Sequence, residues 1–184
     1  MLYTKIDKKG IDTNIDGMQN FLYPKLVALW GLDPTSAFDY NSYARAYRNQ
    51  TQDGYVPEVF VGTKDYKEVF QDDRIKCISF FGVGENIQFV GNQFVADVHL
   101  CFAADITKLN ASAERPDEII RQQIVKLVQG IKLFGFEFKG IETGIDNVFK
   151  EYPGIRKSSG IKFSDMHPNH CFRLNFNVKY KINC

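Results

Sequence analysis

The stretch that decides the fold is residues 170–184, which read HCFRLNFNVKYKINC. Apolar and polar side chains alternate along it without a fault, and this period of two is typical of a β-strand with one buried face. The expected buried face consists of Phe172, Leu174, Phe176, Val178, Tyr180, Ile182 and Cys184. The other face is basic and rich in amides, which suits solvent, an acidic partner or nucleic-acid phosphate; it consists of Arg173, Asn175, Asn177, Lys179, Lys181 and Asn183.

Further strands are expected upstream of this one. Residues 74–83 are an almost continuous apolar run, which indicates a strand buried on both faces. Residues 94–102 alternate, with Asp97 and His99 opposite an apolar set, so they predict an antiparallel strand with one covered face. Residues 55–61 and 136–141 add two shorter strands.

Two helices complete the pattern. Apolar residues recur at three- and four-residue steps over 11–30, with Pro24 expected to kink the helix or restart it. The second helix begins at Pro116 and carries one apolar stripe that ends at Phe134 and Gly135. We therefore expect a single domain, 1–184, with a two-layer α+β fold in which two helices pack on one antiparallel sheet.

Residues 33–54 fit neither period. They contain no Val, Ile or Met but several aromatic residues, with arginines between them. Tyr and Arg are enriched where proteins meet. We interpret the segment as an extended arm that clasps a neighbouring molecule; the alternative is a long loop folded back on its own domain. The residues expected to bind the partner are Phe38, Tyr40, Tyr43, Tyr47 and Arg48.

Composition excludes several classes of protein. The chain has 184 residues with 44% hydrophobic content and a net charge of +1, which argues against a dedicated nucleic-acid binder. No apolar run approaches the roughly 18 residues of a membrane span, and no signal peptide is expected at the N-terminus. The four cysteines, Cys77, Cys101, Cys171 and Cys184, are widely spaced, which suits thiols in a reducing compartment.

The chemistry-bearing residues form no recognisable site. Gly82 and Gly84 lack the third glycine of a dinucleotide-binding turn. His167 and His170, with Cys171 beside them, are the most metal-like group, but no second pair of ligands accompanies them. His99 has no nucleophile near it in the sequence. We therefore expect no catalytic, cofactor or metal site, and a protein that is not an enzyme.

The order of elements resembles the tail terminator and neck ring proteins of tailed bacteriophages. The stretches that carry the resemblance are Phe21-Leu22-Tyr23-Pro24-Lys25-Leu26, Phe94–Phe102 and Phe172–Ile182. The first of them is also similar to segments of Bacteroidota phage genes, including the crAss-like group. The long segment 33–54 departs from many compact terminators, so the position in the neck or tail is left open between a tail terminator, a head–tail adaptor and another collar protein.

This resemblance implies a structural protein of the virion, assembled in the host cytoplasm. Copies would form a ring of six or twelve that abuts portal, adaptor or tail-tube proteins, and DNA would pass through the ring without sequence-specific binding. Arg173, Lys179 and Lys181 would then line the lumen or meet an adjacent ring. The alternative interpretation is a small α+β module that holds an apolar ligand between helix and sheet.

Overall fold

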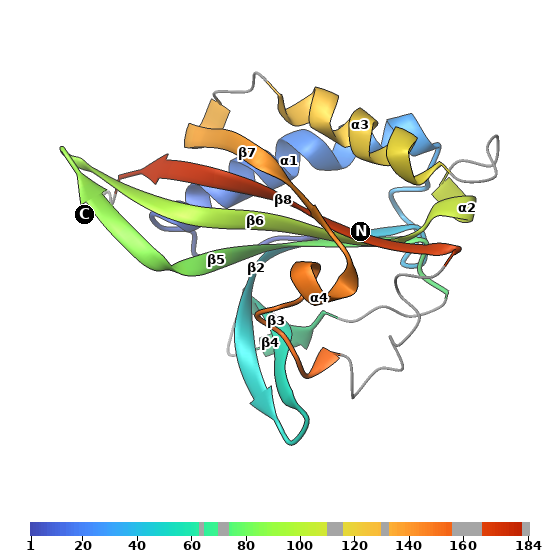
Figure 1. Ribbon diagram of the computed structural model, residues 1–184, viewed down its shortest axis with the longest axis horizontal. Helices are drawn as coiled ribbons and strands as arrows, with labels where there is room; N and C mark the ends of the chain where they lie inside the picture. The colour runs from blue at the N-terminus through green and yellow to red at the C-terminus, as the bar shows by residue number, and fades with distance from the viewer. Residues whose placement is uncertain (63–64, 70–73, 110–115, 130–132, 156–166, 182–184) are drawn as a thin grey trace.

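A computed structural model describes residues 1–62, 65–69, 74–109, 116–129, 133–155 and 167–181. The described chain is a mixed α+β structure built on one large sheet (Figure 1). The strands are β1 (Leu2–Tyr3), β2 (Tyr40–Thr51), β3 (Gly54–Gly62), β4 (Asp65–Glu68), β5 (Cys77–Val90), β6 (Gln93–Asp105), β7 (Phe136–Thr143) and β8 (Asn169–Tyr180). The helices are α1 (Ile11–Trp30), α2 (Ile106–Leu109), α3 (Asp117–Val128) and α4 (Ile145–Val148), with a short 3₁₀ turn, η1, at Leu133–Gly135.

The sheet is mostly antiparallel, as the sequence predicted. Its strand order is β4-β3-β2-β5-β6-β8-β7, and β1 pairs with β2 off this path. Two contacts are parallel: β1 with β2, which α1 separates in the chain, and β2 with β5, which β3 and β4 separate. The α+β class is therefore confirmed, with a mixed sheet rather than a purely antiparallel one.

Strand β8 occupies the interior of the sheet. It pairs with β6 along its whole length, from Asn169 opposite Asp105 to Tyr180 opposite Phe94, and with β7 on its other side. The apolar face predicted for it is confirmed as far as Tyr180, because Phe172, Leu174, Phe176 and Val178 are all buried in one core. Ile182, Asn183 and Cys184 lie outside the described residues.

Helices α1 and α3 lie on the same side of the sheet and cover that core (Figure 1). Helix α1 has the predicted bounds, and Pro24 lies within it without ending it. Helix α3 is shorter than predicted, because its described turns stop at Val128. Phe134 instead belongs to η1, with a φ of 58° that is outside the helical range.

A second core lies on the other face of the sheet, which the two-layer prediction did not include. Ile78, Phe80, Cys101, Ala103 and Cys171 point into it from β5, β6 and β8. The opposite side is closed by apolar residues of the β2–β3–β4 strands and of the segment around α4: Tyr43, Ala46, Val59, Val69, Val148, Phe149, Tyr152 and Ile155. The middle of the sheet is thus buried on both faces.

The predicted arm at 33–54 is not confirmed, since most of this segment is a strand. Residues Tyr40–Arg45 of β2 pair with β5 in the main sheet, and Ala46–Thr51 pair with β3. An irregularity between Ser42 and Arg45 marks the point where β2 turns out of the main sheet. The β2–β3–β4 strands then hang below it in Figure 1.

Candidate interaction surfaces

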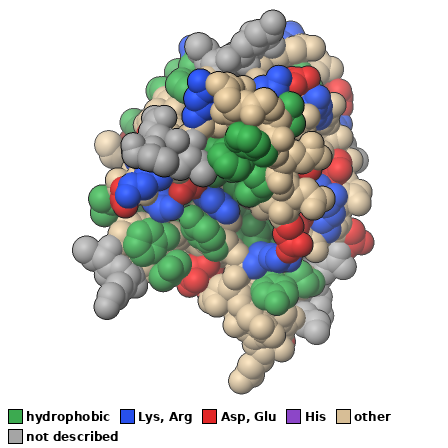
Figure 2. Space-filling view, turned by 90° about the vertical axis from the view of Figure 1, so that its left-hand side faces the viewer, with side chains coloured by type: hydrophobic (Ala, Val, Ile, Leu, Met, Phe, Trp, Pro, Cys, Tyr) green, Lys and Arg blue, Asp and Glu red, His purple; other side chains and the backbone are tan. Residues whose placement is uncertain are grey.

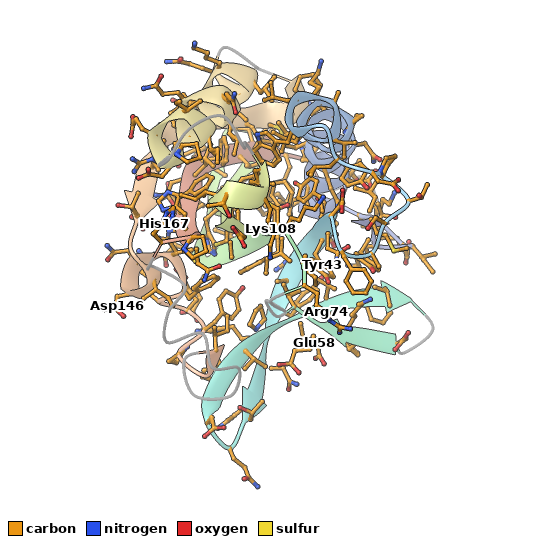
Figure 3. All side chains as sticks on the ribbon, turned by 90° about the vertical axis from the view of Figure 1, so that its right-hand side faces the viewer. Tyr43, Glu58, Arg74, Lys108, Asp146 and His167 are labelled. Atoms are coloured by element: carbon orange, nitrogen blue, oxygen red, sulfur yellow. The ribbon has the colours of Figure 1, made fainter. Side chains whose placement is uncertain are left out.

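The aromatic residues predicted to bind a partner divide into buried and exposed ones. Tyr40 is buried under α1, and its hydroxyl lies 2.8 Å from Ser79 Oγ. Tyr43 is buried on the opposite side of the sheet and stacks on Tyr3, with ring centroids 4.7 Å apart. Figure 3 labels Tyr43 where β2 leaves the main sheet. Both rings therefore belong to the core of this chain and present no surface to another molecule.

The other residues of this group lie nearer the surface. Phe38 is exposed, and the Arg74 guanidinium lies 5.1 Å from the centre of its ring. Tyr47 is half-buried and accepts a hydrogen bond of 3.2 Å from Lys5 Nζ. Arg48 is exposed and forms an ion pair with Glu85 of β5. The five residues therefore do not form one common patch.

Arg173 does not lie on an exposed face with the two lysines. It points into the second core, is 4% exposed, and is held by two carboxylates. Its Nε lies 2.6 Å from Glu142 Oε2, and its Nη1 donates to both oxygens of Glu151 at 3.0 Å. Burial alone would raise the pKa of Glu142, but Arg173 and Lys150 together outweigh this and the pKa is lowered. Arg173 thus fastens β7 and the segment after α4 to the sheet.

His99 lies beside this ion-pair cluster. It is buried opposite Gly82 of β5, and its Nε2 is 3.9 Å from Glu151 Oε2. Burial lowers the pKa of His99 to about 4, because the imidazolium form would lose its hydration, and the attraction of Glu151 does not offset this loss. His99 is therefore neutral at pH 7 and acts as a packing residue.

Lys179 and Lys181 are exposed, as predicted. Lys181 also lines a small hollow of about 240 Å³ at the start of α1, together with Lys8, Lys9, Gly10, Thr13 and Asn14. Two of the lysines that line this hollow are already paired, since Lys8 Nζ lies 2.7 Å from Asp16 Oδ1 and Lys9 Nζ lies 3.7 Å from Asp7 Oδ2. The basic surface at this end of the molecule is therefore made of lysines and does not include Arg173.

The most prominent exposed apolar feature is the end of the β5–β6 hairpin, here called the hairpin tip (residues 85–93). It extends furthest to the left in Figure 1. Ile87, Phe89 and Val90 are 49%, 65% and 59% exposed. The Phe89 ring packs on Phe94 with centroids 5.0 Å apart, and Phe94 stacks on Tyr180 at 5.5 Å, so an aromatic row runs from the core to the tip. Figure 2, which looks at this end, shows hydrophobic side chains grouped among lysines and arginines.

The hairpin tip also has an open backbone edge. Strand β2 pairs with β5 only from Cys77 to Phe81, so among the described residues no strand pairs with β5 beyond Phe81 on that side. Val90 lies opposite Gln93 across a two-residue loop, so these two residues are expected to form the hydrogen-bonded pair that closes the turn. By the alternation of an antiparallel ladder, the amide groups of Ile87 and Phe89 then point to the open edge.

A groove lies at the opposite edge of the sheet, between α3 and β7, and is here called the α3–β7 groove. It has a volume of about 520 Å³ and is lined by Glu118, Arg121, Gln122, Val125, Lys126, Gln129, Ile141 and Thr143. Within the described chain, β7 pairs only with β8, so its outer edge borders this groove unpaired. Sequence reasoning missed both this groove and the hairpin tip, although the turn at Gly91-Asn92 and the apolar residues before it were visible.

The described residues hold no group of three or more His, Cys, Asp or Glu side chains placed to bind a metal ion. His170 instead stacks on Phe172, with ring centroids 5.3 Å apart. No helix in the described part of the chain is long and apolar enough to cross a membrane. The most distinctive surfaces in this part of the chain are thus the hairpin tip and the α3–β7 groove.

Comparison with protein-family models, with curated proteins and with solved structures finds no match for this chain.

Proposed function

We propose that this chain is a structural protein that works by assembling with copies of itself, as a ring in the neck or tail of a tailed bacteriophage. The observation that carries the proposal is the hairpin tip, which holds three large apolar side chains in solvent at the end of a projecting strand pair. The assignment to a phage rests in addition on the order of elements along the chain, which resembles that of tail terminator and neck ring proteins.

The hairpin tip is costly in an isolated molecule. Exposed sheet edges in natural proteins are usually blunted by charges, proline or short length. Between Ile87 and Val90 there is neither charge nor proline; the nearby features that blunt the edge are Glu85 and the irregular pairing between Val83 and Ile87. Covering three half-exposed apolar side chains would contribute about 3 kcal/mol per copy. An interface with a second molecule explains why such an edge is retained.

Charge at this end is compatible with a channel for DNA. Lys179, which lies opposite Val95 of β6, and Lys181 supply positive charge beside the hairpin strands, whereas Lys8 and Lys9 are paired with Asp16 and Asp7. The whole chain is close to neutral at +1. A few phosphate contacts give weak, salt-dependent and sequence-independent attraction. DNA would therefore pass such a surface without being held. Arg173 takes no part in this proposal, because its guanidinium is buried and paired.

The test is the assembly state of the purified chain, measured by analytical ultracentrifugation and negative-stain electron microscopy. Six or twelve copies of the 21.1 kDa chain are expected in ring-shaped particles, either alone or after addition of portal and tail-tube proteins. A sample that stays monomeric over a wide concentration range, with and without those proteins, would refute the proposal.

A matched pair of variants then ties assembly to the hairpin tip. Phe89→Glu places a charge in the apolar row and is expected to weaken assembly at least tenfold. Tyr66→Glu is the control, because Tyr66 is similarly exposed but lies on β4, away from the tip. Equal loss of assembly in both variants would show that added negative charge, and not the hairpin tip, is responsible.

A further inference from the structure

We propose that the hairpin tip of one copy docks along the α3–β7 groove of the next copy, so that β5 of the first extends the sheet of the second at β7. This inference rests on the proposed function, since it names the contact that would build the ring. Strand addition to an open sheet edge beside a helix is a common mode of recognition, in which main-chain hydrogen bonds give affinity and alternate side chains fill pockets.

Side chains on the open edge of β5 and on the outer edge of β7 point to the same face of the sheet, the one covered by α1 and α3. Ile87 lies opposite Ala96, and Phe89 opposite Phe94; both partners belong to the face covered by α1 and α3. On β7, Ile141 and Thr143 lie opposite Leu174 and Phe172, which belong to that same face, and both line the groove. If β5 continues the sheet beyond β7, the Ile87 and Phe89 side chains therefore enter the space between β7 and α3.

Strand direction allows this contact without reversing a subunit. Strands β5, β6, β8 and β7 are consecutive in the sheet, and every neighbouring pair among them is antiparallel. Strand β7 therefore runs opposite to β5, and β5 of a second copy in the same orientation would be antiparallel to β7. The pattern of the sheet would continue from one subunit into the next.

Charge is compatible with the same pairing. The only charged residue of β5 between Gly82 and Val90 is Glu85, and it is already paired with the exposed Arg48 of β2 in the same copy, so this edge is close to neutral. The groove carries Arg121 and Lys126 against Glu118, which makes it basic by one charge. Docking a nearly neutral edge in this groove brings no like charges together, so electrostatic repulsion does not oppose the contact.

The contact joins two different surfaces, so it is heterologous. Each copy that uses its hairpin tip leaves its own groove free for another copy, and such contacts close into a ring when the rotation permits. Across the sheet, Ile87 of β5 is in register with Phe136 of β7, through Ala96 of β6 and Val178 of β8. Ile141 of β7 pairs instead with Leu174, which lies four residues before Val178 on β8. Docking Ile87 beside Ile141 thus needs a stagger of about 13 Å, as in sheets whose strands are tilted to the axis of closure.

The experiment is a complementation test with two single variants of the full chain. Phe89→Glu disables the hairpin tip and leaves the groove intact, whereas Ile141→Glu disables the groove and leaves the tip intact. Each variant alone is expected to be monomeric by light scattering. A 1:1 mixture restores one productive contact per pair, so a species of about 42 kDa, twice the 21.1 kDa chain, is expected.

Two further variants test whether the loss of assembly is specific to the α3–β7 groove. Ile119→Glu is the matched control for the groove, because Ile119 is an exposed residue of α3 that does not line it, and this variant should assemble like the parent chain. Gln122→Trp fills the groove from the exposed surface of α3, so it blocks docking without changing the β7 edge. Circular dichroism of each variant confirms that it is folded.

The outcomes separate this inference from the proposed function. If Ile141→Glu and Gln122→Trp assemble like the parent chain while Phe89→Glu does not, hairpin tips pair with one another or with another surface; the groove proposal is then wrong and self-assembly stands. If the parent chain stays monomeric both with and without portal and tail-tube proteins, both proposals fail. Monomeric single variants whose mixture forms the 42 kDa species support the heterologous contact.

Discussion

Replacing Arg173 by methionine is expected to destabilise the protein strongly, although the sequence alone places this residue on an exposed face. The guanidinium is buried and bonded to Glu142 and Glu151, so Arg173→Met leaves two carboxylates without their cation. Removing one partner of a fully buried ion pair costs about 3–5 kcal/mol. Because both glutamates are about a third exposed and can regain water, we expect a loss of about 2–3 kcal/mol.

The assay is urea unfolding followed by fluorescence of Trp30, the single tryptophan, which is the last residue of α1, is buried in the first core and so reports on loss of that core. The matched control is Lys179→Met, on the same face of the same strand but exposed, for which a change within about 0.5 kcal/mol is expected. In thermal unfolding the difference corresponds to about 4–10 °C for a chain of this size. If the two variants unfold at the same urea concentration, the assignment of Arg173 to a buried ion-pair cluster is wrong.

Three other predictions follow from the same cluster and from β2. His99, whose folded pKa is about 4 against an ordinary 6.5, binds fewer protons in the folded state, so the free energy of unfolding should fall by about 3 kcal/mol as the pH drops from 6.5 to 4; His99→Gln should flatten this dependence in urea titrations at each pH. Gly82→Ala would place a Cβ 1.9 Å from His99 Nε2 and should cost about 1–3 kcal/mol, measured in the same way; an unchanged midpoint would contradict the packing of His99 on Gly82. Deleting residues 41–50 removes most of the strand that joins β3 to β5, so circular dichroism should show loss of the fold; a folded deletion variant would restore the interpretation of this segment as an arm or loop.

The sequence predicted those elements whose side chains follow one period and face one core. Helix α1 is such an element, and so is the apolar face of strand β8, because each packs in the first core. Strand β2 was missed for a physical reason. Its tyrosines at 40 and 43 are an odd number of residues apart, and the structure buries them in opposite cores, so no alternation was visible. Its buried polar residues are also partnered from elsewhere, as when Gln19 Nε2 donates to Ser42 O at 3.0 Å.

The surfaces were harder to predict than the strands. Alternation correctly put Arg173 and Lys179 on one side of β8, but it did not show that residues 142–151 cover only the first half of that side. The hairpin tip posed the opposite problem, because a phenylalanine such as Phe89 suggests a core residue, whereas the structure places it at the projecting end of the β5–β6 hairpin with 65% of its surface exposed. Whether a strand face is covered depends on segments distant in the chain, which local patterns do not describe.

The pairing of the sheet also sets the order in which this chain can fold. Strands β5 and β6 are joined by a two-residue turn, so they can pair early in folding, because closing so short a loop costs little entropy. Strand β8 pairs with β6 only after the chain has left at Asp105 and returned at Asn169, and such distant closures slow folding. During synthesis the hairpin would therefore form long before β8 is made. A nascent chain would then expose its apolar hairpin tip to other nascent chains on the same messenger RNA.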